Sequence, residues 1–178
     1  MTSALNGIKI ADFSRVLAGP YATMLLGDLG ADVIKIERTG TGDDTRGWGP
    51  PFDAQGRATY FQSVNRNKSG IALNLANPVD AEKALEIALA SDVVVENFQS
   101  GGMEKFGLGY EQLKVLNPKI IYCSITGFGS SELAAELPGY DLLVQGMSGL
   151  MSITGESDSP TKVGVALIDV LALSLIHI

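Results

Sequence analysis

Apolar residues along this chain fall into two alternating patterns, short runs rich in Val and Ile and longer stretches with helical spacing. Runs of the first kind predict buried β-strands, and stretches of the second kind predict helices. We expect strands over residues 8–14, 32–38, 70–75, 92–98 and 119–129. We expect helices over residues 19–31, 77–90, 110–118 and 140–151, and a last helix that begins near Asp169. Strands that alternate with helices are typical of βαβ units.

The strands are almost continuously apolar, which fits a parallel sheet that is buried on both faces. Because parallel crossovers are right-handed, helices should cover both sides of such a sheet. The predicted fold class is therefore α/β, a Rossmann-like parallel sheet with helices on both faces. Residues 39–60 interrupt the rhythm as a long polar, glycine-rich loop, and loops of that length are usually functional or mobile. No repeat or domain boundary is visible, and 178 residues fit one domain.

Charge narrows the class of partner. The formal net charge is −7, which argues against nucleic acid or an anionic membrane as a main partner, because both require a basic surface. The charge is unevenly spread. Residues 1–76 hold eight Lys/Arg against seven Asp/Glu, whereas residues 77–178 hold five against thirteen. An anionic small ligand should therefore find its cations mainly in the first half of the chain.

The cysteine content and the two ends of the chain bear on location. Cys123 is the only cysteine, lies in an apolar run and reads as a small core residue. No disulfide can form within the chain, which fits a reducing cytoplasm. The first residues lack the pattern of a signal peptide, and the apolar tail is shorter than the roughly 20 residues that span a bilayer. We expect a cytoplasmic protein without a membrane partner.

Polar, glycine-containing and partly basic segments follow the predicted strands. In open parallel sheets, ligands bind beyond the carboxyl ends of the strands. There, helix N-termini and Arg15 or Arg38 could attract an anion, although ordinary βα turns have the same composition. Glu37 stands where an NAD-binding protein has its ribose-binding acid. The first turn, "SRVLAGPYA", nevertheless lacks the G-x-G-x-x-G motif, so NAD is disfavoured.

A lone carboxylate stands in the apolar run "VGVALIDVLALSLI" near the end of the chain. Asp169 could cap a buried helix, which is a common use of aspartate. It could also be a functional carboxylate that its apolar neighbours shield from water. The residues alone leave both interpretations open.

Several blocks of the sequence agree with one protein family in order and spacing. They include "GIKIADFSRVLAGPYATMLLGDLGADVIKIER", "GDDTRGW", "NRNKSGIALNL", "DVVVENFQSGGMEKFGLGYEQL", "PGYDLLVQGMSGLMSITG" and "PTKVGVALIDV". Together they resemble the class III coenzyme A transferases, the CaiB/BaiF family, over residues 4 to about 172. The resemblance implies an enzyme that moves CoA between carboxylic acids. Acyl-CoA and a carboxylic acid acceptor would be its partners, and it would bind neither a metal nor a permanent cofactor.

In this family the catalytic aspartate lies in the block that matches "VGVALIDV", so the resemblance implies Asp169 as nucleophile. Its carboxylate would form a mixed anhydride with the acyl group and then an aspartyl-CoA thioester. CoA contacts carried over from the family fall on Val16, Leu17, Ala18, Arg38, Leu73, Asn97, Phe98 and Lys105. Tyr140 and Asp141 are expected near the acyl group.

The resemblance leaves two alternatives. One is an α-methylacyl-CoA racemase of the same superfamily. Those enzymes pair a histidine with an aspartate, whereas the matching stretch here has Tyr140 and the only histidine is His177. The other is a CoA-binding chain without catalysis.

Family members are about twice as long and form interlocked homodimers. Residues 1–178 are accordingly expected to form the N-terminal portion of the CoA-binding large domain, without the smaller domain and the C-terminal return segment. Turnover by this chain alone is not expected. The closing "LALSLIHI" departs from the family pattern.

Overall fold

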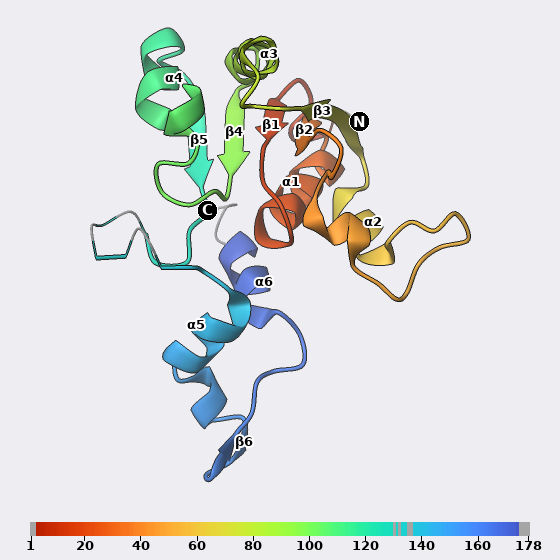
Figure 1. The fold of residues 1–178 in the computed structure, drawn as a ribbon, viewed down its shortest axis with the longest axis vertical. Coiled ribbons are helices and arrows are strands. Elements are labelled where there is room, and N and C mark those ends of the chain that lie inside the picture. Colours follow the sequence, from red (N-terminus) through yellow and green to blue (C-terminus); the bar gives the residue numbers. More distant parts are fainter. Residues whose placement is uncertain (1–2, 130, 132, 135–136, 175–178) are drawn as a thin grey trace.

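The computed structural model describes residues 3–129, 131, 133–134 and 137–174, and its centre is a five-stranded sheet (Figure 1). In spatial order the strands are β3 (Lys68–Leu73), β2 (Asp32–Arg38), β1 (Lys9–Asp12), β4 (Val93–Glu96) and β5 (Ile121–Ser124). Every neighbouring pair is parallel. The strand order reverses between β1 and β4, and at such a switch point the connecting segments leave in opposite directions and open a crevice. The predicted α/β class with a Rossmann-like parallel sheet is confirmed.

Helices cover both faces of the sheet. On one face lies α1 (Ala18–Asp28), against which α2 (Thr59–Asn65) packs, and on the other lie α3 (Pro78–Leu89) and α4 (Tyr110–Leu116). Side chains alternate along β1, so Ile10 belongs to the core beneath α1 and Ala11 to the core beneath α3. Both are at most 1% exposed. Burial on both faces explains why the strands read as nearly continuous apolar runs.

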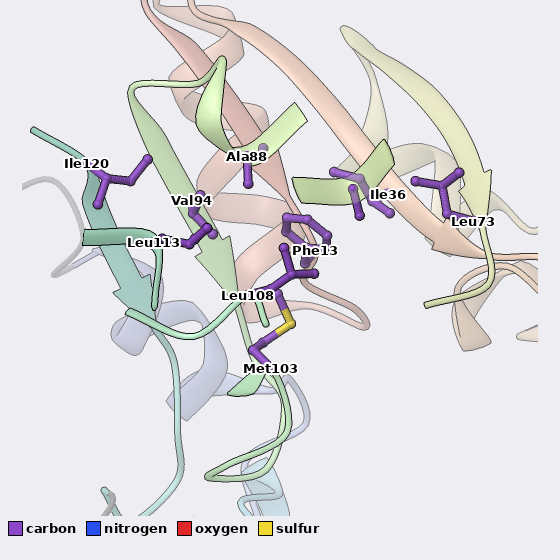
Figure 2. Close-up of a cluster of buried hydrophobic side chains, with 11 residues drawn as sticks. Phe13, Ile36, Leu73, Ala88, Val94, Met103, Leu108, Leu113 and Ile120 are labelled. Carbon is purple, nitrogen blue, oxygen red and sulfur yellow. The ribbon is translucent and has the colours of Figure 1, made fainter. Parts of the chain in front are cut away.

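The larger core lies on the α3/α4 face, and Figure 2 shows its side chains converging from the sheet, from α3 and α4 and from the segment after β4. Phe13, Met103 and Leu108 are at most 2% exposed and pack together in this cluster. Burial of a side chain of this size stabilises the fold by roughly 1.5–3 kcal/mol. This packing fixes the segments that leave β1 and β4 at their carboxyl ends.

Local sequence signals explain part of the element boundaries. Helix α3 begins where predicted, with Pro78 in its first turn and the Asn77 side chain accepting the N–H groups of Val79 and Asp80 at 2.9 and 3.3 Å. The prediction of one long loop over residues 39–60 was wrong in part. That segment contains a 3₁₀ turn, η1 (Asp44–Gly47), and helix α2 begins at Thr59.

The last part of the described chain begins with α5 (Asp141–Met147) and η3 (Leu150–Ser152). The strands β6 (Gly155–Glu156) and β7 (Ser159–Pro160) form a small antiparallel hairpin, where a polar connection was expected. This hairpin extends away from the sheet (Figure 1). The predicted last helix is α6 (Leu167–Ser174), which packs against α1 and α5.

Two further expectations concern the cysteine and the possibility of a membrane-spanning helix. Cys123 lies on β5 with its side chain half-buried and its thiol free. Across the part of the chain that the structure describes, no helix combines the length and the apolar character needed to cross a bilayer.

Candidate active site

The connection after β1 is tied to β4 across the switch point. The side-chain amide of Asn97 accepts the backbone N–H of Arg15 at 2.8 Å and donates to the carbonyl oxygen of Arg15 at 2.7 Å. Asn97, one of the predicted CoA contacts, therefore holds the turn that contains three others, Val16, Leu17 and Ala18.

Val16 adopts an unusual backbone conformation within this turn. Its φ is 69°, in the left-handed region that β-branched residues rarely enter. A residue of this kind costs about 1–3 kcal/mol and persists only where its surroundings determine the conformation. Here the Val16 N–H lies 3.3 Å from each carboxylate oxygen of Asp43. The turn is therefore held in a strained shape at the carboxyl edge of the sheet.

A buried network of charges supports the same turn. Lys35 Nζ lies 3.1 Å from Asp43 Oδ2, and Lys68 Nζ lies 2.9 Å from Asp12 Oδ2. All four side chains are at most 2% exposed. Burial raises the pKa of Asp12, but the charges of Lys68 and Lys35 outweigh it, so the pKa lies below its ordinary value. Burial likewise raises the pKa of Asp43 and is outweighed, chiefly by Lys35. Both carboxylates are therefore ionised at neutral pH.

Ion pairing leaves one basic residue of the first half free at this edge. Of the eight Lys/Arg in residues 1–76, six form ion pairs. Lys9 and Arg38 form none with any residue that the structure describes. Lys9 begins β1, at the amino edge of the sheet, and Arg38 ends β2, at the carboxyl edge. Arg38 is therefore the cation of that half that is available to an anion beyond the strands.

Arg38 lines a pocket of about 350 Å³ between the ends of β2 and β3. The same pocket is lined by Glu37, Gly40, Thr41, Gly42, Arg46, Gly70, Ile71 and Ala72. The Glu37 carboxylate is engaged by Arg46 through hydrogen bonds of 2.6 and 2.7 Å. The structure therefore uses Glu37 as the partner of Arg46, whereas an NAD-binding protein would use this carboxylate to bind a ribose. The glycine motif of such a protein is also missing.

The other predicted CoA contacts, Leu73, Phe98 and Lys105, differ in how far their side chains are accessible to a ligand. Leu73 is 6% exposed and belongs to the core, so its backbone is the part that a ligand could meet. Phe98 is half-buried, and the Arg15 guanidinium lies 5.6 Å from the centre of its ring. Lys105 lies in the 3₁₀ turn η2 (Glu104–Phe106), which follows β4. All three follow or end strands at the carboxyl edge, so the structure brings these contacts to one edge of the sheet.

Asp169 lies in the first turn of α6, and Figure 1 shows this helix beyond the carboxyl ends of β4 and β5. Its side chain is half-buried. Burial and the charge of Asp141 raise the pKa of the Asp169 carboxyl above its ordinary value. The carboxylate is thus more basic than a solvated aspartate, which favours nucleophilic attack once it is ionised.

Asp141 caps the helix that carries Asp169. Its Oδ1 atom accepts the backbone N–H groups of Ile168 and Asp169 at 2.8 and 3.3 Å, and its Oδ2 accepts the Gln145 side-chain amide at 2.6 Å. Gln145 is 1% exposed and accepts the Val163 N–H at 2.8 Å. Asp141 therefore orients α6, whereas Tyr140 is 71% exposed at the start of α5.

Sequence reasoning missed two aromatic residues at this site. Tyr60 is half-buried on α2. Burial, and then the charges of Asp169, Asp43 and Asp141, raise the pKa of its hydroxyl. The Trp48 ring packs against it, with the ring centres 5.4 Å apart. Trp48 belongs to the "GDDTRGW" block of the sequence, whereas helix α2, which carries Tyr60, has no sequence signal.

These groups suit covalent chemistry on an anionic substrate. A shielded carboxylate is present at Asp169, a hydroxyl donor at Tyr60 and a cation at Arg38. No group of His, Cys, Asp and Glu side chains that could hold a metal ion occurs among the described residues. His177 lies outside the described residues.

Comparison with protein families and curated proteins gives consistent results. The model of "CoA-transferase family III" matches residues 5–176. The chain is 52% identical over 172 residues to a succinate–glutarate CoA-transferase from Agrobacterium fabrum, covering 93% of this chain and 43% of that enzyme. It is 53% identical over 166 residues to a succinyl-CoA:glutarate CoA-transferase from Mus musculus, covering 93% of this chain and 38% of that enzyme. The chain thus spans about two fifths of the length of these relatives.

Solved structures agree with the fold. A CAIB/BAIF family protein from Brucella suis superposes with a TM-score of 0.92 at 46% sequence identity. The match covers 99% of this chain and 49% of that protein.

Proposed function

The chain belongs to CoA-transferase family III, and we propose that it supplies the nucleophile and much of the CoA-binding surface of an enzyme that moves CoA between carboxylic acids. One observation carries the proposal. The carboxylate of Asp169 is half-buried on a helix that lies beyond the carboxyl ends of the strands, the edge where Val16, Asn97 and Arg38 also lie. The family's expected nucleophile and expected CoA contacts therefore share one side of the sheet.

The proposed reaction begins at an Asp169 oxygen. This oxygen attacks the carbonyl carbon of the acyl-CoA thioester, the C–S bond breaks, and CoA leaves as a thiolate. The products are an aspartyl mixed anhydride and the thiolate. The thiolate then attacks the aspartyl carbonyl carbon, which gives an aspartyl-CoA thioester and releases the donor acid as its carboxylate. Division of one difficult exchange into two acyl transfers is the benefit of covalent catalysis.

The second half repeats these steps with the acceptor. The incoming carboxylate attacks the aspartyl thioester, and a new anhydride and the CoA thiolate form. The thiolate attacks the acceptor's carbonyl carbon, which gives the product thioester and restores the Asp169 carboxylate. Water would hydrolyse both intermediates, so partial burial of Asp169 supports this sequence of steps. We also propose that the Tyr60 hydroxyl, whose pKa is raised by burial and by the charge of Asp169, donates a hydrogen bond to the oxyanion or to the substrate carboxylate.

The names of the relatives suggest the class of acid. The two curated relatives described above are named as a succinate–glutarate and a succinyl-CoA:glutarate CoA-transferase. A relative from Haloarcula marismortui that is 49% identical over 170 residues is named as a succinyl-CoA:mesaconate CoA-transferase. We propose short dicarboxylic acids, with succinyl-CoA as donor. Because the chain spans 38–43% of the Agrobacterium and mouse relatives, we also propose that residues 1–178 correspond to the N-terminal portion of the CoA-binding large domain. Turnover and homodimer formation would then require the remainder.

Covalent trapping tests the assignment directly. The chain is incubated with succinyl-CoA, treated with hydroxylamine or borohydride, and mapped by mass spectrometry, while CoA affinity is measured separately by calorimetry. We expect CoA binding and a modification at Asp169 that is missing in Asp169→Asn. CoA binding with no adduct would reduce the chain to a CoA-binding protein, and no binding would refute the proposal. Exchange of an α-proton with deuterated water would instead indicate a racemase.

A further inference from the structure

Three consecutive residues of the turn after β1 are each held by a side chain from elsewhere. The Ser14 carbonyl oxygen accepts Lys35 Nζ at 2.8 Å. Arg15 is held through its backbone by Asn97, and the Val16 N–H points at the Asp43 carboxylate. These holding groups come from β2, from the end of β4 and from the loop after β2.

Lys35 and Asp43 act together in this arrangement. One ammonium group, 2% exposed, contacts both Ser14 and Asp43, so it fixes the turn and the carboxylate that restrains it. The remaining acceptor capacity of Asp43 Oδ1 is used by the backbone N–H and hydroxyl of Thr45, at 3.0 and 2.8 Å. Both oxygens of the carboxylate are therefore engaged by donors, from Lys35 and Val16 at Oδ2 and from Val16 and Thr45 at Oδ1.

The strained backbone of Val16 suggests a reason for these contacts. Among the described residues outside glycine, only Val16 and Asn67 have a positive φ. Asparagine tolerates that conformation, whereas a β-branched residue does not. If stability alone mattered, a glycine at position 16 would remove the strain. A strained residue at a candidate ligand site supports a functional interpretation.

We propose that Asp43, paired with Lys35, is the positioning residue of the CoA-binding turn. By accepting the Val16 N–H it keeps Val16 left-handed, and this sets the direction of Leu17 and Ala18 where α1 begins. Asp43 contacts no CoA in this proposal and acts through Val16. The inference rests on the proposed function, because it concerns the CoA-binding turn.

The test is a double-mutant cycle read by CoA affinity and by thermal unfolding. Asp43→Asn replaces one carboxylate oxygen by an NH₂ group, which is a donor. In one orientation of the amide this NH₂ faces the donors of Lys35 and Val16, and in the other it faces those of Thr45 and Val16. We expect CoA to bind about tenfold more weakly, equivalent to about 1.4 kcal/mol. In a Val16→Gly background, glycine adopts the positive φ without strain. D43N should then weaken CoA binding by less than about threefold. Equal costs on both backgrounds would overturn the proposal.

Two controls separate positioning from stability. Asp92→Ala removes a side chain that accepts a backbone N–H, that of Lys9 at 2.9 Å, at the amino edge of the sheet. It should lower thermal stability without changing CoA affinity. If D43N folds poorly because Lys35 is left alone, the K35M/D43L variant removes both charges and every side-chain acceptor at position 43, and it should show the same tenfold loss of CoA affinity.

A readout without CoA keeps this inference separate from the proposed function. NMR coupling constants and ¹³Cα shifts report the φ of Val16. We expect a left-handed Val16 in the wild type and a negative φ in D43N and K35M/D43L. A Val16 that stays left-handed in both variants would refute the positioning role, whether or not CoA binds. Absence of CoA binding to the wild type would refute the proposed function alone.

Discussion

The Asp141 carboxylate lies against the first turn of the helix that carries Asp169, and its Oδ1 atom accepts the Asp169 backbone N–H at 3.3 Å. It has two opposing effects on that residue. As a cap it satisfies backbone donors at the start of α6, which stabilises the helix. As a negative charge it raises the pKa of the Asp169 carboxyl, in addition to the effect of burial. The same contact therefore orients the candidate nucleophile and makes it more basic.

The first prediction concerns the pKa of Asp169. Asp141→Asn keeps an oxygen for the cap but removes the charge, so the pKa of Asp169 should fall. It should stay above the ordinary value because burial, the larger cause, is unchanged. A ¹³C NMR titration of the side-chain carboxyl measures the change. Asp158→Asn, in the exposed turn between β6 and β7, is the control and should leave the pKa where it is. An unchanged pKa in D141N would contradict the charge effect.

The second prediction concerns the cost of the nucleophile to stability. A carboxyl whose folded pKa is raised favours folding only while it is protonated, and this contribution is lost as pH rises through the folded pKa. At neutral pH the ionised Asp169 therefore opposes folding. Asp169→Asn should raise the melting temperature at pH 7, and in a domain of this size each 1 kcal/mol of added stability corresponds to about 2–4 °C. The gain should vanish near pH 3, and D169N should show no covalent adduct. A lower melting temperature at pH 7 would count against this reading.

The third prediction concerns Arg38 as a phosphate ligand. A charge-assisted hydrogen bond contributes about 1.5–3 kcal/mol, so Arg38→Gln should weaken CoA binding by roughly 10- to 100-fold. Binding of pantetheine, which has no phosphate, should hardly change. Lys9→Gln is the matched control, because Lys9 is the other unpaired cation of the first half within the described chain and lies at the opposite edge of the sheet. If R38Q and K9Q bind CoA equally well, Arg38 is not the phosphate ligand.

The elements that could be predicted from the sequence are those with local signals. Strand β2 (Asp32–Arg38) matches the expectation at both ends, because an apolar run is bounded by a glycine turn and a polar loop. Helix α3 is also predictable, because its capping residue Asn77 and the proline of its first turn, Pro78, are visible in the sequence. Helix α2 begins inside a polar segment and follows no apolar period, so tertiary contacts with α1 and η1 decide it.

The candidate site was predictable only in part. Asp169 and the strand-end segments are visible in the sequence, and their shared edge follows from a parallel sheet. The role of Asp141 depends on α5 and α6 lying together, 27 residues apart between Asp141 and Ile168. The sequence offers Lys35 and Lys68 as cations for an anionic ligand, but the structure buries both against carboxylates. Which charges pair inside the fold is set by three-dimensional packing and has no sequence pattern.

The fourth prediction follows from that burial. Asp12→Ala leaves the Lys68 ammonium, 2% exposed, without its carboxylate, which should cost about 3–5 kcal/mol of unfolding free energy in urea. Replacement of both residues, D12A/K68M, should recover a large part of the loss. As a control, Glu86→Ala breaks the Lys83–Glu86 pair, whose side chains are 55% and 60% exposed, and should cost less than about 1 kcal/mol.

The pH dependence of the same variants provides an independent check. The pKa of Asp12 is lowered because Lys68 and Lys35 outweigh burial, so its contribution is full above the ordinary value of 3.8 and is lost as pH falls through the folded pKa. The stability gap between the wild type and D12A should therefore narrow in acid below about pH 4, while the gap for E86A stays small throughout. A D12A cost no larger than that of E86A, or a gap that widens in acid, would mean that the buried carboxylate is not paired in solution as it is in this structure.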